Sequence, residues 1–193
     1  MLRFFHVLGV VLLGGGLLGV WVADLRSRFA RSVFVLAEAC HYEMLFYYGL
    51  VFPGALLVGL SGLLLILELG LGFFAAPWLT GMWVLFLAEF VEGNSITHWH
   101  LRRMRERATR ARLLGQPTEE LREQMGRRLG SFTHFLDLPL FLVIVFLGTT
   151  RPGSWSVVVA ALAVAVAAAA LLTALVPRHA PMVAERQIGA SQT

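Results

Sequence analysis

The sequence contains no lysine and only one cysteine, and charged residues make up 15% of its 193 positions. The single Cys40 excludes an internal disulfide bond and any metal cluster that several cysteines would hold. The GxSxG, P-loop, CxxC and CxxCH motifs are also absent. These absences leave no recognisable soluble-enzyme motif, and so little charge is not typical of a soluble domain.

Apolar residues are instead the main component. They make up 58% of the chain, and the mean hydropathy is +0.73. A transmembrane helix needs about 20 mostly apolar residues, so a chain of this length has room for four or five such helices. The composition therefore predicts an all-α integral membrane protein. We expect one transmembrane domain over residues 1–177 and a disordered cytoplasmic tail over residues 178–193.

Five apolar segments predict five transmembrane helices, a four-helix core plus an Ala-rich fifth helix. They cover about residues 4–23, 44–69, 78 onward, 130–148 and 155–176. Residues 28–43 mix charged and apolar side chains, which predicts an interfacial helix on the membrane surface before the second span. Within that span, Pro53-Gly54 is expected to disturb the helix, because proline removes a backbone hydrogen bond.

All basic residues are arginines, and nine of them lie between Arg102 and Arg128, in a segment predicted to be a loop. This segment also carries glutamates and has no aromatic side chain to stack on a base, so we do not expect nucleic acid as a partner. Cytoplasmic loops of membrane proteins are rich in arginine. The distribution predicts an amino terminus outside and a cytoplasmic carboxyl terminus in a bacterial-type inner membrane.

Four ionisable residues fall inside the predicted third and fourth spans. At a rise of about 1.5 Å per residue, Glu89 and Asp137 both lie roughly 17 Å from the outer boundary, and Glu92 and His134 both lie roughly 21 Å from it. Charged groups at this depth are costly unless they are paired, neutralised or bound to a metal. The four side chains are therefore predicted to form one connected site, possible ligands of a metal ion.

Four further histidines allow two interpretations. His6 follows two phenylalanines at the start of the first span, and His41 precedes the second. His98 and His100 are two residues apart and cannot share a helix face, and His100 is on the face of Glu89. Each of the four is either an interfacial residue or a cofactor ligand.

Several short motifs occur in a particular order. His6 is followed by Gly16, Pro53 precedes GLSGLLLIL, Pro77-Trp78-Leu79 begins a later span, and FTHFLDLP ends at Pro139. Over about residues 4–150 this order resembles the small membrane proteins related to HemJ-type protoporphyrinogen oxidase and to CopD, especially a branch of predicted membrane proteins of unknown function. The resemblance implies a helical bundle that binds haem b, with His6 as a candidate ligand. HemJ-like proteins carry a lysine near the position of Met82, and this sequence has no lysine. The resemblance therefore implies haem binding but not protoporphyrinogen oxidation.

Two classes of function follow. The first is a membrane-embedded redox or electron-transfer protein with haem b, for which the candidate ligands are His6, His41, His98, His100 and His134. A non-haem transition metal is the alternative cofactor, with Glu89, Glu92, His134 and Asp137 as its ligands. The second class is a non-enzymatic subunit or a proton or metal-ion transporter of CopD-like type. The partners expected are the lipid bilayer and other membrane subunits of a redox complex.

Overall fold

The computed structural model describes residues 1–125 and 128–176, with side chains at all of these positions except 128–131. This described part is helical, and it contains no β-strand. The all-α prediction is therefore confirmed. The tail predicted over residues 178–193 lies outside the described residues.

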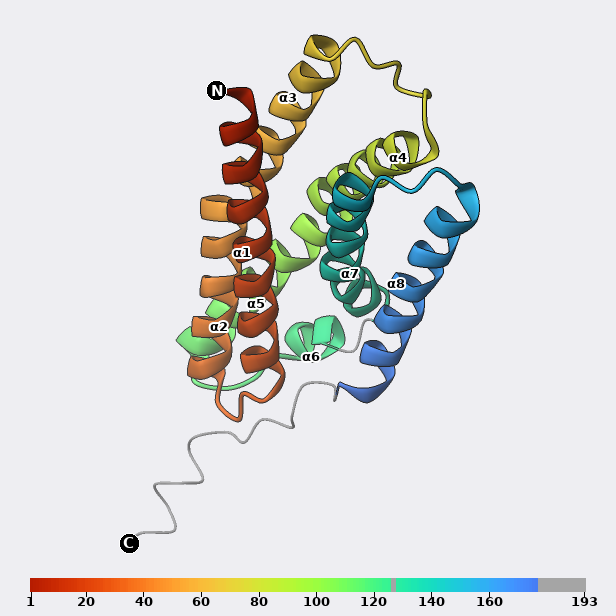
Figure 1. Ribbon diagram of the computed structural model, residues 1–193. Coiled ribbons are helices and arrows are strands. Elements are labelled where there is room, and N and C mark those ends of the chain that lie inside the picture. The colour runs from red at the N-terminus through yellow and green to blue at the C-terminus, as the bar shows by residue number, and fades with distance from the viewer. Residues whose placement is uncertain (126–127, 177–193) are drawn as a thin grey trace, which may run out of the picture.

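Ten helical elements follow one another along the described part of the chain (Figure 1). They are α1 (Leu2–Arg28), α2 (Val33–Phe46), η1 (Tyr47–Val51), α3 (Phe52–Glu68), α4 (Pro77–Glu92), η2 (Gly93–Thr97), α5 (His98–Leu114), α6 (Glu119–Met125), α7 (Arg128–Thr150) and α8 (Trp155–Leu175). The elements η1 and η2 are π-helical. α1 packs against α2 and α3, whereas α7 packs against α4 and α8.

Four helices in the described residues are long and apolar enough to cross a membrane. They are Leu2–Arg28, Val33–Glu68, Phe132–Thr150 and Trp155–Leu175. The predicted third span, α4, is not one of them, because its 16 residues continue through η2 into the arginine-rich α5. A five-span count is therefore not confirmed.

The second span begins earlier in the structure, at Val33, than the predicted start at about residue 44. Residues 28–43 do not form a separate surface helix, because Val33–Glu68 is one continuous helix of 36 residues. At about 1.5 Å per residue this helix is about 54 Å long, well beyond a hydrocarbon core of about 30 Å. The helix is therefore longer than one membrane crossing requires.

The arginine-rich segment is also different from the predicted loop, because most of it forms α5. This helix packs against α2 (Figure 1), and the buried contact includes Cys40, Met104 and Ala108. Small side chains along this contact allow the two helices to lie close together. The arginines at positions 102, 103, 105, 110 and 112 of α5 are exposed. The segment is thus an amphipathic helix whose apolar face packs against α2.

The disturbance predicted at Pro53-Gly54 appears as the π-helical turn η1. Pro53 has no N–H to donate to the carbonyl of Gly49, as an α-helix would require. The five residues before Phe52 adopt the wider π-helical register instead. Gly54 allows the helix to approach α1, since a Cβ there would lie 2.5 Å from the backbone nitrogen of Leu13. The break in regular geometry thus falls where the second long helix meets the first.

Candidate functional site

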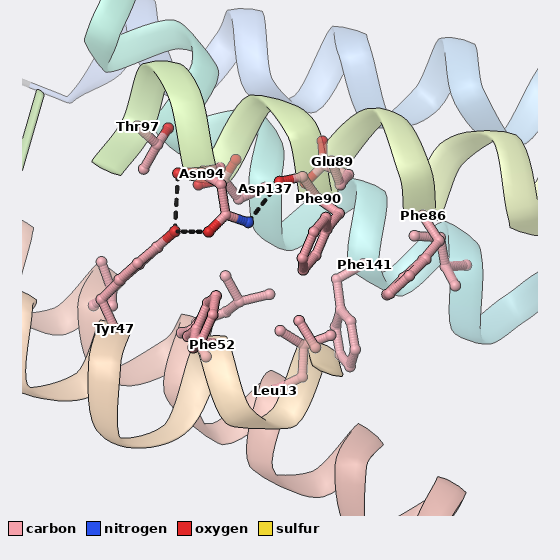
Figure 2. A pocket seen from close by; sticks show the side chains of 16 residues that line it. Leu13, Tyr47, Phe52, Phe86, Glu89, Phe90, Asn94, Thr97, Asp137 and Phe141 are labelled. Carbon is pink, nitrogen blue, oxygen red and sulfur yellow. Dashed lines mark hydrogen bonds between the residues drawn. The ribbon is translucent and has the colours of Figure 1, made fainter. Parts of the chain in front are cut away.

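A cavity of about 70 Å³ lies between the two packed halves of the bundle. One side is formed by α1, η1 and α3, and the other by α4, η2 and α7 (Figure 2). The lining residues are Leu13, Leu17, Val20, Tyr47, Val51, Phe52, Ala55, Phe86, Glu89, Phe90, Gly93, Asn94, Thr97, Asp137, Phe141 and Ile144. One water molecule requires about 10–15 Å³ of such space, so the cavity has room for a few.

Two carboxylic side chains from different helices are part of the mostly apolar lining of this cavity. Glu89 comes from α4 and Asp137 from α7, and in Figure 2 both lie on the side of the cavity opposite Leu13 and Phe52. Asp137 is 9% exposed and lies within electrostatic range of Glu89 and Glu92. The lining contains no arginine or histidine. The structure thus brings together two groups that the depth argument placed at the same level.

The two π-helical elements face each other across the cavity, linked by Tyr47 of η1. Its hydroxyl donates to the carbonyl oxygen of Gly93 in η2 at 2.9 Å and contacts the side-chain oxygen of Asn94 at 3.4 Å (Figure 2). Thr97, at the end of η2, donates to a carboxylate oxygen of Glu92 at 3.0 Å. Single π-helical turns occur often at functional sites, because they change the direction of nearby side chains.

A second set of buried polar side chains lies at the last turn of α1. The Arg28 guanidinium donates from Nε to Oδ2 of Asp24 at 2.6 Å, with both side chains buried. Glu43 of α2 is 2% exposed and lies beside this pair and Ser27. We refer to Asp24, Arg28 and Glu43 as the Asp24 cluster. The cation is also placed over the ring of Phe135, 4.8 Å from its centre.

His134 lies between the Asp24 cluster and the cavity. Its Nε2 is 3.6 Å from Oδ2 of Asp24, and its Nδ1 is 3.8 Å from Oδ2 of Asp137. The side chain is 5% exposed, and neither ring nitrogen has a hydrogen-bond partner among the described residues. Each nitrogen of the imidazole thus has one carboxylate nearby, and these carboxylates belong to different polar groups.

The other predicted histidines lie apart from this site. Nδ1 of His6 is 3.1 Å from the hydroxyl of Ser61, at the contact between α1 and α3. His41 is exposed, whereas the ring of His98 packs against the rings of Tyr47 and Tyr48. Nδ1 of His100 is 3.0 Å from Nε2 of Gln124 in α6. The structure does not bring these four histidines together.

Several site residues were not predicted from the sequence. Asp24 and Arg28 are four residues apart, which is the spacing of a helical ion pair and the one sequence signal for them. Glu43 was assigned to a surface helix. Tyr47 and Asn94 carried no signal, because a π-helical turn has no sequence pattern comparable to apolar periodicity.

The arrangement limits what the site can bind. Within residues 1–125 and 128–176 no group of three or more histidine, cysteine, aspartate or glutamate side chains is arranged to hold a metal ion. Ligand pockets usually have about 300–1,000 Å³. The cavity beside Glu89 and Asp137 is several times smaller, so haem does not fit it.

The fold and this site define a polytopic α-helical membrane protein with carboxylic groups buried between its helices. The family model described as "Predicted integral membrane protein (DUF2269)" matches residues 1–152. The chain belongs to this family. Neither the curated proteins nor the solved structures include a match to the chain. The matched region contains the cavity and the Asp24 cluster and ends between α7 and α8.

Proposed function

We propose that this protein transfers protons within the membrane and that Glu89 and Asp137 are its proton-binding groups. The observation that carries the proposal is that these two carboxylic groups share one small cavity whose lining contains no arginine or histidine. An ionised carboxylate in an apolar environment costs several kcal/mol unless a counterion accompanies it. A pair of carboxylic groups in this setting therefore binds protons readily from water in the cavity.

The donor set favours a proton over a larger cation. Ca²⁺ requires six to eight oxygen ligands, and Mg²⁺ requires nearly ideal octahedral geometry. Apart from its two carboxylic groups, the cavity offers only Tyr47, Asn94 and Thr97 as polar side chains, and the Asn94 amide already donates to the carbonyl of Phe90. A proton needs only one oxygen and a short chain of water.

The proposal includes the orientation and the setting of the protein. If the amino terminus is outside and α4 with η2 crosses the membrane as a fifth span, fourteen of the sixteen arginines fall on the cytoplasmic side, as the positive-inside rule favours. We place the protein in the bacterial-type inner membrane, as a transporter or a subunit of CopD-like kind. The Asp24 cluster then lies toward the cytoplasmic side.

The experiment is proton uptake into liposomes that contain the purified protein, driven by a potassium diffusion potential and followed by an entrapped pH-sensitive dye. The double variant Glu89→Gln, Asp137→Asn is expected to lower uptake to the rate of protein-free liposomes, because neither amide can exchange a proton as a carboxylic acid does. Glu68→Gln, at an exposed position of α3, is the matched control. Wild-type uptake no faster than that of protein-free liposomes would contradict the proposal.

Haem b binding is a second candidate, which one observation favours at His6. Histidines that bind metals usually have their second ring nitrogen fixed by a hydrogen bond, and Nδ1 of His6 lies 3.1 Å from Ser61. The Nε2 atom would be the ligand, and the haem would bind at the α1–α3 surface rather than in the cavity. A dithionite-sensitive Soret band that His6→Ala removes would support this candidate, and its absence from the purified protein would exclude it.

A further inference from the structure

The polar residues around His134 form a nearly continuous row from the cavity to the end of α1. Asp137 lines the cavity, His134 is next to it, and Asp24 and Glu43 follow. These residues come from three different helices, α7, α1 and α2, so the row is a product of the tertiary fold. In the interior of a membrane protein, ionisable side chains that lie next to one another in space are the usual arrangement of a proton path.

The two ring nitrogens of His134 are placed for proton transfer in both directions. Both are buried and without a hydrogen-bond partner among the described residues, although an imidazole that only stabilised the fold would usually use at least one of them. Their distances of 3.6 and 3.8 Å to the two carboxylates exceed those of a hydrogen bond. A movement of about 0.4 Å toward Asp24 or about 0.6 Å toward Asp137 makes one.

We propose that His134 carries protons between the Glu89–Asp137 cavity and the Asp24 cluster. This inference rests on the proposed function, and it adds the route by which protons reach or leave the cavity. It also assigns a role to a histidine that the sequence suggested only as a metal or haem ligand.

The transfer can be written with its charges and protons balanced. Protonated Asp137 gives its proton to Nδ1 of neutral His134, which leaves an Asp137 carboxylate and an imidazolium. The imidazolium then gives the proton on Nε2 to the Asp24 carboxylate, which leaves a neutral ring with its proton on Nδ1. Rotation of the side chain about both its Cα–Cβ and Cβ–Cγ bonds turns this N–H from Asp137 toward Asp24, so that the unprotonated nitrogen can accept the next proton from Asp137. The charged groups that face the ring are Asp24 and Arg28 of α1 and Asp137 of its own helix.

The Asp24 cluster suits the receiving end of this path. The anion of Asp24, which the Arg28 guanidinium holds at 2.6 Å, stabilises the imidazolium as it forms. Glu43 offers the next carboxylic group, and its Oε1 has no hydrogen-bond partner within the described part of the chain. A proton that reaches Asp24 can therefore pass to Glu43.

The test uses the same liposome assay with His134→Gln, which keeps a polar side chain but cannot accept a proton at neutral pH. Uptake is expected to fall about 100-fold, a typical loss for a missing proton-transfer group. The exposed His41→Gln is the matched control and should leave uptake unchanged. In His134→Ala, added imidazole should restore part of the uptake, which a purely structural role of His134 would not allow.

The outcomes separate the two proposals. If Glu89→Gln, Asp137→Asn abolishes uptake but His134→Gln leaves it at the wild-type rate, the route is wrong and the cavity retains its role. If the wild type takes up no protons, both proposals fail. Should the His134 variants not fold, Glu43→Gln keeps both the histidine and the Asp24–Arg28 pair and is expected to slow uptake, and an unchanged rate would overturn the route.

Discussion

Replacing Arg28 with methionine is expected to lower the free energy of unfolding by about 3 to 5 kcal/mol. The guanidinium is 5% exposed, donates to Asp24 at 2.6 Å and lies over the ring of Phe135. Methionine fills much of the same space but leaves the Asp24 carboxylate buried without its cation. Denaturant unfolding of the protein in detergent micelles, followed by circular dichroism, measures the change.

Arg26 provides the matched control for this variant. It pairs with Glu38 at 3.5 Å, but its side chain is 59% exposed, so Arg26→Met should cost no more than about 1 kcal/mol. The double variant Asp24→Leu, Arg28→Met removes both charges and should be much more stable than Arg28→Met alone. Equal losses for Arg26→Met and Arg28→Met would show that the buried pair has no special importance for the fold.

Filling the cavity is expected to reduce proton uptake almost to the rate of protein-free liposomes. Ala55 of α3 lines the cavity and is 9% exposed. Leucine at this position occupies space beside Glu89 and Asp137 that has room for a few water molecules, while both carboxylic groups stay in place. The liposome assay measures the rate, and circular dichroism checks that the variant folds, because overpacking typically costs about 1–3 kcal/mol.

The control for the cavity variant is Ala88→Leu. Ala88 precedes Glu89 in α4, but it is exposed on the outside of the helix and does not line the cavity. The same increase in size should therefore have no effect on uptake. Wild-type uptake in Ala55→Leu would mean that protons do not pass through this cavity.

The sequence predicted the helical class and most of the spans because apolar runs are a direct signal of a membrane segment. It did not predict that Val33–Glu68 is a single helix, because charged residues before Met44 look like an interfacial segment when their burial is unknown. Cys40 and Ala108 show what was missing: the contact of α2 with α5 buries that segment. Such a contact depends on residues more than sixty positions apart.

For the site, counting residues from the ends of two helices was enough to place Glu89 and Asp137 at one level. The same counting grouped His134 with them, and the structure places its ring beside Asp137 and also beside Asp24. The Asp24 contact could not be predicted, because it depends on how α1 rotates against α7. The π-helical turns, which bring Tyr47 to Gly93, likewise follow from the packing of whole helices.

Infrared difference spectroscopy of the protein in bilayers tests the central claim most directly, because it detects protonated carboxylic groups without any assay of transport. A change of pH should produce a C=O stretching band of a buried carboxylic acid, shifted in D₂O, that Asp137→Asn removes or alters and Glu68→Gln preserves. That result would show proton exchange at Asp137 inside the bundle. Identical spectra for the wild type and Asp137→Asn would contradict the account.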